Sequence, residues 1–588
     1  MNKPQNPFTV ISPERLSAVE AKQLFVKVFT DFPQMKSEGN SIMFGSRGSG
    51  KSMMLRCLMS DVILPDGGKI DDLDFLSFLI SVKNTELKIT ELEVLEESGG
   101  AYMINEHFFI VTILVEILNW LANVKNFDLP YDRERYELFH NDIYRKCLRF
   151  CRYKGEVNGN FGTAKEYFQS LHDHAMLELH GIFKDYILSL PIAHGKVLPS
   201  YKLPLLSFAR FLSPFLKGVR DLLNLAGKNV YLLIDDADNL SVTQTRILNS
   251  WIIARTQPEI SIKVSSQVSK YKSFMGTNRV LVETPHDYHE IRISERYTNS
   301  KNTYYKRVEE IINKRLILAG IERTALDYFP VKEAQEQKIE EEAERLKSSW
   351  SESGRGYRPG DDALRYARPN YIRDLGGEKK SRSTYAYAGF FQLVNLSSGV
   401  IRNFLDAAST MYEEEKEANV LSHITYGVQD SVMRGKAYSK MFAEFPKLAM
   451  DFCPHAGEVG KAQKLQNLVF AMGRTFYDIL VSDLSERRVF SIALTNIPDE
   501  EIKEVLDFGV QTGYFYEASV GNKEGTGKTW LYILNRMLAP QFNLDPNGFS
   551  GYLFVTNEAL RSAIYSGKKL RDIKSGESDG LEQLNLFD

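Results

Sequence analysis

Short apolar runs alternate with amphipathic stretches along the first half of the chain. Apolar runs at 41–44, 75–82, 229–234, 260–265 and 289–293 have the length and composition of buried strands. The residues between them show the period of amphipathic helices, and we expect one such helix over 12–32. Strands that alternate with helices predict a parallel α/β sheet.

A long helical stretch, about 104–224, separates the second and third of these runs. Breaks are expected near Pro130, over Gly155–Gly162 and around Pro191–Pro204. The gap is long for a compact core, so we predict a helical insertion over about 84–224; ordinary core helices with long loops are the alternative. The most apolar window, Phe108–Val124, contains Glu116 and Asn119, which favours a buried helix over a membrane span.

The second half of the chain has a different pattern. Helices are predicted over 301–350, 387–417, 434–447 and 462–483, with a solvated charged helix at 332–347 and an exposed loop at 351–384. A strand at 488–494, a helix at 499–509 and a strand-turn-strand at 514–534 suggest a winged helix. We predict a core at 1–300, a helical linker and lid at 301–420, a helical and winged-helix domain at 421–565, and a disordered tail at 566–588.

Composition limits the functional classes. The chain of 588 residues is 43% apolar and 25% charged, as in soluble proteins, and its net charge of -3 means that any DNA contact needs a local basic patch. Its four cysteines form no metal-binding pattern and suit a reducing compartment. The N-terminus lacks the apolar run of a signal peptide, so we expect a soluble, cytoplasmic protein without a membrane partner.

Residues 45–52 read GSRGSGKS, a full match to the phosphate-binding P-loop pattern. The apolar SIMF before it predicts a strand, and MMLRCLM after it predicts a helix. Backbone N–H groups of such a loop bind phosphates. We therefore assign ATP binding to the whole loop, which comprises Gly45, Ser46, Arg47, Gly48, Ser49, Gly50, Lys51 and Ser52. Lys51 would contact the β- and γ-phosphates, and Ser52 would ligate Mg²⁺.

The strand NVYLLIDDADNL, residues 229–240, ends in two acids. As the Walker B partner of the P-loop, Asp235 would hold the magnesium ion, and Asp236 would act as general base on the attacking water. In the next strand, Ser265, Ser266 or Gln267 stands where a γ-phosphate sensor would lie, and an ordinary serine-rich strand end is an equal alternative. The sequence thus predicts a Mg²⁺-dependent ATPase.

Residues 525–529, GTGKT, imitate a P-loop. The first glycine of the full pattern is missing, because position 522 is Asn522, and both flanks read as strands. We predict a hairpin tip, the wing of the winged helix. Lys523 and Lys528 would then be basic groups available to DNA phosphates.

With these motifs located, the chain resembles the bacterial relatives of the Orc1/Cdc6 AAA+ ATPases. The resemblance rests on GSRGSGKS, LLIDDADNL and the lid-like stretch YAGFFQLVNLSSGVIRNFLDAAS at 387–409. It implies that Arg402 is the lid arginine called sensor 2, which acts on the γ-phosphate, and that Gly399 permits a tight helix start. Arg279 and Arg296 are candidates for an arginine finger that acts on a neighbouring subunit, and a homo-oligomer is expected.

Two features depart from the origin-binding pattern. The acids are Asp235-Asp236 rather than Asp-Glu, a form typical of signal-transducing STAND ATPases, and the helical insertion is long. Both departures favour the second of two hypotheses. The first, which the basic wing favours, is a slowly hydrolysing switch that acts on double-stranded DNA or a DNA-bound complex. The alternative is a STAND-like sensor of antiviral defence that assembles with an effector protein.

The last residues contain QLNLF, which resembles the peptide that binds the bacterial sliding clamp. Gln583, Leu584, Leu586 and Phe587 would be its anchors in a hydrophobic pocket. The alternative is a tail that docks on its own domain or has no function.

Overall fold

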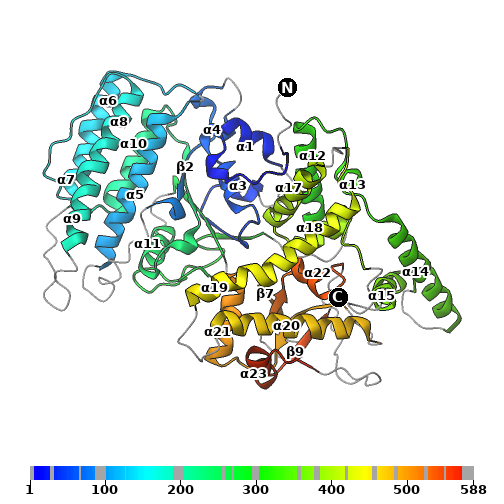
Figure 1. Ribbon diagram of the computed structural model, residues 1–588. Coiled ribbons are helices and arrows are strands. Elements are labelled where there is room, and N and C mark those ends of the chain that lie inside the picture. The colour runs from blue at the N-terminus through cyan, green and yellow to red at the C-terminus, as the bar shows by residue number, and fades with distance from the viewer. Residues whose placement is uncertain are drawn as a thin grey trace. The chain divides into compact units, whose positions relative to one another are not determined.

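The structure is a computed structural model (Figure 1). It describes residues 6–26, 32–64, 68–85, 101–125, 127–189, 204–254, 258–267, 270–293, 303–353, 359–375, 384–417, 422–452, 460–482, 488–521, 528–547 and 551–571. The chain divides into two compact units. One unit comprises Ile11–Ser294, and the other comprises Met1–Val10 together with Glu295–Asp588. We call them the core unit and the lid unit.

The core unit contains the predicted parallel sheet. Its strands are β1 (Ser41–Phe44), β2 (Phe75–Ser81), β3 (Asn229–Asp235), β4 (Ile260–Ser266) and β5 (His289–Arg292). They pair in the order β2-β3-β4-β1-β5, and every pair is parallel. Parallel strands place their carboxyl ends at one edge, so the residues that follow β1, β3 and β4 meet there.

Shorter helices cover this sheet. They are α1 (Ala18–Leu24), α2 (Phe32–Lys36), α3 (Lys51–Arg56), α4 (Ser60–Ile63) and α11 (Val242–Ile253). The single helix predicted over 12–32 is wrong. Ser17 and Glu20 form a capping box that starts α1, and Phe25 is extended and ends it, so two short helices replace one.

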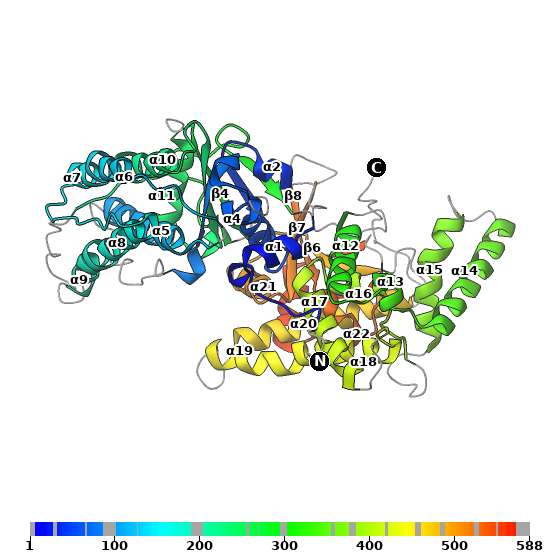
Figure 2. The ribbon, with the colours of Figure 1, turned by 90° about the horizontal axis from the view of Figure 1, so that it is seen from above.

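The helical insertion lies between β2 and β3 in chain order, and its helices lie side by side in Figures 1 and 2. They are α5 (Ala101–Asn123), α6 (Arg133–Phe139), α7 (Lys146–Phe150), α8 (Ala164–His174), α9 (Gly181–Ser189) and α10 (Ser213–Leu222). Among the described residues, α5 is the one helix long and apolar enough to cross a bilayer, yet 72% of its most apolar window is buried. It is a core helix, as predicted, and contacts α8 and α11.

The N-terminal part of the lid unit is helical. Its helices are α12 (Thr303–Leu318), α13 (Ala325–Tyr328), α14 (Glu333–Ser353), α15 (Pro359–Leu375), α16 (Phe390–Leu396), α17 (Ile401–Glu417), α18 (Tyr426–Tyr438) and α19 (Glu444–Phe452). The start of the chain packs here. Phe8 is fully buried beside Tyr328 and Tyr412, and the Asn6 amide donates to the Ser409 carbonyl at 3.0 Å.

The exposed loop predicted at 351–384 is wrong over most of its length, because α15 occupies 359–375 and pairs with α14 (Figure 2). Buried Ala363, Ala367 and Asn370 follow a helical spacing, and the Arg368 guanidinium pairs with Glu336 of α14 at 2.6 Å. Pro359 and Gly360 at the start of the helix, Pro369 within it and the glycines on either side dominated the sequence pattern. The helix itself depends on α14 as a packing partner, which no local window reveals.

The C-terminal part of the lid unit has a second sheet. Its strands β6 (Val489–Leu494), β7 (Phe515–Gly521), β8 (Lys528–Leu534) and β9 (Gly551–Val555) pair in the order β7-β8-β6-β9. Around it stand α20 (Lys461–Val481), α21 (Glu500–Gln511), α22 (Ala539–Phe542) and α23 (Asn557–Ser566). The disordered tail predicted from residue 566 is wrong at its start, since Leu570 is buried and its N–H donates to the Thr475 hydroxyl at 3.0 Å; residues 572–588 lie outside the described residues.

Candidate nucleotide site

The P-loop connects β1 to α3 as the sequence predicts. Gly48 and Gly50 adopt φ angles of 85° and 105°, which residues with a side chain rarely adopt. A Cβ on Gly45 would lie 2.7 Å from the Ser49 hydroxyl and 3.4 Å from the Ile293 side chain. Glycine at these positions therefore lets the backbone form a closed loop, with Arg47 exposed on its outside.

Lys51 is the first residue of α3, and only 6% of it is exposed. Its ammonium donates to the carbonyls of Gly45 and Ser46, at 2.7 and 2.9 Å. The charge therefore lies inside the loop. The hydroxyl of Ser49 is also buried and has no hydrogen-bond partner among the described residues, so it is a polar group suited to a bound ligand.

The two acids at the end of β3 have different environments. Asp235 is fully buried; burial raises the pKa of its carboxyl, and hydrogen bonds from the Ser265 and Ser52 hydroxyls act in the opposite direction. Asp236 is half-buried and has a left-handed backbone with φ 56°. Its carbonyl accepts from the Asn239 amide at 3.0 Å, which stabilises this turn.

Burial raises the pKa of Asp236 to about 6, and the nearby charges of Asp235 and Asp238 add to this effect. Lys51 and Lys83 oppose it. At neutral pH the carboxylate is ionised and more basic than an ordinary aspartate, as a general base requires.

The donor set fits magnesium. The Ser52 hydroxyl lies near enough to the Asp235 carboxylate to lower its pKa, so two hard oxygen ligands from different elements are adjacent, and the Oδ2 atom of Asp235 is buried with no hydrogen-bond partner among the described residues. Histidine and cysteine are absent from this pair, and the described residues contain no cluster of three His, Cys, Asp or Glu side chains suited to a metal. This pair is therefore suited to a magnesium ion bound together with phosphate oxygens rather than to a site made by the protein alone.

The structure separates the three residues proposed at the end of β4. The Ser265 hydroxyl donates to Asp235 and accepts the backbone N–H of Asp236 at 3.1 Å. The Ser266 hydroxyl instead donates to the Gln267 carbonyl at 3.2 Å, and the Gln267 amide donates to Asp238 at 2.9 Å. Sequence reasoning did not distinguish them, because only the sheet brings this strand end beside β3.

The predicted arginines stay untested. Arg402 is exposed on the first turn of α17 and makes no ion pair among the described residues of the lid unit, and Gly399 has φ 73° as expected for a tight helix start. Arg279 is exposed in a turn of the core unit, and Arg296 lies outside the described residues. Their roles toward a nucleotide remain predictions.

The second glycine-rich sequence is part of a hairpin, as predicted. β7 and β8 pair antiparallel, with Gly521 opposite Lys528, whereas a P-loop joins a strand to a helix. Lys523 lies outside the described residues, as do all four anchors of the QLNLF peptide, Gln583, Leu584, Leu586 and Phe587. DNA binding by the lysines and clamp binding by the peptide stay predictions.

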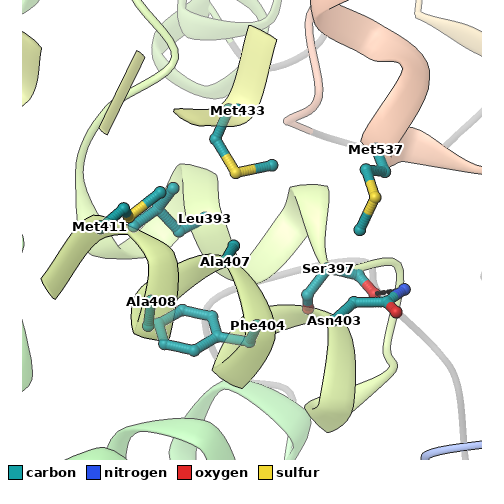
Figure 3. Close-up of a pocket in the computed structure, with 9 residues that line it drawn as sticks. All are labelled: Leu393, Ser397, Asn403, Phe404, Ala407, Ala408, Met411, Met433 and Met537. Carbon is teal, nitrogen blue, oxygen red and sulfur yellow. Dashed lines mark hydrogen bonds between the residues drawn. The ribbon is translucent and has the colours of Figure 1, made fainter. Parts of the chain in front are cut away.

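A small cavity in the lid unit lies between α16, α17, α18 and the turn that carries Met537 (Figure 3). Met411, Met433 and Met537 border it together with Phe404 and Leu393. Its volume is about 10 Å³, enough for one water molecule at most. We interpret it as imperfect packing around flexible methionines rather than as a ligand site.

Comparison with known proteins gives one family. A family model described as ORC-CDC6-like matches residues 6–554. No curated protein matches the chain at a significant level. Among solved structures, Cdc6p from Pyrobaculum aerophilum is similar at 13% identity and a TM-score of 0.28, over 96% of this chain and 98% of that one. An Aeropyrum pernix Orc1 protein in complex with DNA is similar at 10% identity and a TM-score of 0.27, over 92% and 96% of the two chains.

Proposed function

This chain belongs to the ORC-CDC6-like family, and on that premise we propose that it is a magnesium-dependent ATPase that acts as a switch on DNA or on a DNA-bound complex. The observation that carries the proposal is the adjacency of Ser52 and Asp235 beside a P-loop whose lysine is buried. The AAA+ core with further helical and C-terminal domains is the expected architecture of such a switch.

Each residue of the site has a distinct task in this proposal. Ser52 and Asp235 would hold magnesium, which supplies positive charge against the phosphates when it is bound. Lys51 adds a fixed positive charge within the loop. Asp236 accepts the proton of the attacking water, because its raised pKa makes it a stronger base than Asp235 would be when bound to a cation.

The DNA contact is proposed for the wing and not for α21. The helix order α20, β6, α21, β7, β8 suits a winged helix, but α21 presents Glu500, Glu501, Glu504 and Asp507 against one lysine, Lys503. Phosphates repel such a helix. Lys523 and Lys528 at the hairpin would therefore provide the phosphate contacts.

ATP hydrolysis measured with and without double-stranded DNA over a salt series tests this function. We expect DNA to stimulate hydrolysis and the stimulation to fade as salt rises, because counterion release drives the contact. Lys51→Ala should abolish ATP binding, and Asp236→Asn should bind ATP without hydrolysing it. Normal hydrolysis by Asp236→Asn would refute the assignment of the base.

The wing is tested separately. Lys523→Ala combined with Lys528→Ala should weaken DNA binding and reduce the salt slope by about one per lysine. Lys503→Ala on α21 is the matched control and should leave DNA binding unchanged. An equal loss in the control would move the contact to α21.

A protein-triggered switch is the second candidate, and one observation favours it. Large apolar side chains are exposed on the described part of the insertion, among them, by 62, 60, 75 and 73%, Leu138, Phe150, Leu177 and Leu188. Such side chains suit a protein partner such as an effector. Hydrolysis that is indifferent to DNA at every salt concentration would favour this candidate.

A further inference from the structure

Ser265 connects the two acids of the site through one hydroxyl. It donates to the Asp235 carboxylate and accepts the backbone N–H of Asp236 at 3.1 Å. A serine hydroxyl has one proton and can accept a hydrogen bond at the same time, so both contacts coexist. Both Ser265 and Asp235 have no exposed surface, so water does not compete for these contacts.

The register of β4 with its neighbouring strands places Ser265 beside the two acids. β4 lies between β3 and β1, with Val264 opposite Ile234 and Ser265 opposite Met43. Asp235 and Ser265 follow the Ile234–Val264 pair, so they lie side by side at the edge of the sheet where the P-loop begins. Asp236 turns away there in a left-handed conformation, and its N–H meets Ser265 rather than a strand partner.

We propose that Ser265 is a positioning residue: its hydroxyl holds the Asp235 carboxylate and the Asp236 turn in one arrangement, so that Asp235 faces magnesium and Asp236 faces water. The inference deepens the ATPase function proposed above and rests on it. Ser265 in this role acts through the two acids and does not contact the γ-phosphate itself. Its neighbour Ser266, equally buried, makes neither contact.

Three variants of the full chain test the inference. Ser265→Ala removes the hydroxyl, and Ser265→Thr keeps it. Ser261→Ala is the matched control, because Ser261 is equally buried on the same strand and its hydroxyl accepts the Gly39 N–H at 3.0 Å. A fluorescent ATP analogue is titrated into the protein, once in the presence of EDTA and once in the presence of Mg²⁺. The ratio of the two affinities is the gain from magnesium. Hydrolysis rates and melting temperatures are measured on the same samples.

We expect Ser265→Ala to bind the analogue in EDTA within about twofold of wild type. A hydrogen bond to a charged group is worth about a factor of ten or more, so its gain from magnesium and its kcat should each fall at least about tenfold. Ser265→Thr should restore most of both, and Ser261→Ala should retain them. A purely structural role would instead lower affinity in EDTA and the melting temperature.

Other results overturn the inference. An unchanged magnesium gain and kcat in Ser265→Ala would exclude positioning, and an equal loss in EDTA would indicate general disruption. The same losses in Ser261→Ala would show that any buried hydroxyl of this strand, and not that of Ser265 in particular, matters. A wild type that gains nothing from magnesium refutes the ATPase proposal itself, and the inference with it; a wild type with a normal gain in which only the variant pattern fails refutes the inference alone.

Discussion

The helical insertion of the core unit and the polar joint of the lid unit both bury polar side chains, but in different forms. By polar joint we mean the residues around Arg368, Arg488, Arg536 and Asp545, where α15, α16 and the C-terminal part of the lid unit meet. The insertion buries neutral hydrogen-bonded rings. The joint buries charges. The difference predicts that acid destabilises the insertion and that the loss of one charged side chain destabilises the joint.

The insertion contains histidines paired with tyrosines. His174 bonds Tyr144 at 3.1 Å and Tyr153 at 3.0 Å, and His140 contacts Tyr167 and the Val157 carbonyl. Burial lowers the pKa of His174 to about 4 and also lowers that of His140. The rings are therefore neutral at pH 7, and no counter-charge is needed.

The joint depends on opposite charge. Asp545 is 2% exposed and accepts the Asn547 N–H at 2.9 Å. Burial raises the pKa of its carboxyl, while Arg368, Arg488 and Arg536 act against this effect. The backbone N–H of Arg536, which is 1% exposed, donates to the Ser398 hydroxyl at 2.7 Å, which joins this cluster to the turn before α17.

The largest expected effect breaks the joint. Asp545→Ala removes the buried carboxylate whose charge acts on Arg368, Arg488 and Arg536. Breaking a buried charge pair typically costs about 3–5 kcal/mol, and we expect the lower end because Arg368 keeps its pair with Glu336. We expect faster hydrogen exchange in α15, α16 and the turn at Ser398, with the insertion unchanged. Asp406→Ala, at a surface pair with Lys436, is the control and should have little effect. Unchanged exchange in Asp545→Ala would show that the charges of the joint are solvated in solution.

Acid should loosen the insertion by a smaller amount. The pKa of His174 is about 4 in the folded protein and 6.5 for a free side chain. The contribution of the neutral ring to the stability of the insertion is therefore fully present above pH 6.5 and is lost as the pH falls toward 4. At pH 5 the loss is roughly 2 kcal/mol. Hydrogen exchange of α8 at pH 7 and 5, corrected for the intrinsic rate, measures it.

His174→Phe sharpens this result. The variant should be less stable at pH 7, because the Tyr144 and Tyr153 hydroxyls lose a partner, but its further loss on acidification should be smaller than that of wild type. An equal loss in both proteins would assign the pH dependence to other groups.

The smallest effect is expected on the surface of the insertion. Arg133 pairs with Glu137 at 2.8 Å on α6, but its side chain is 69% exposed. Exposed pairs contribute little. We expect Arg133→Ala to leave exchange and melting unchanged. A clear loss would mean that surface charge matters here as much as buried charge.

The sequence predicted the strands and the P-loop well because both depend on local patterns. The five parallel strands lie within a few residues of their predicted bounds. It failed at α15, whose stability needs α14, and at residues 566–571, where Leu570 packs on α20. The sequence predicted where the P-loop and the two acids lie in the fold but not their mutual contacts, and their roles toward ATP stay predictions.

The sequence by itself determined that a loop with glycines at 45, 48 and 50, followed by Lys51 and Ser52, joins a strand to a helix in a closed turn, since backbone conformation there is set within eight residues. It also determined that two acids end a buried strand. Only the tertiary structure decided that Ser265 and Ser52 hold Asp235, that Asp545 faces three arginines, and that the insertion buries neutral rings. Each of these contacts joins residues far apart in the chain, and burial fixes their strength only once the chain has folded.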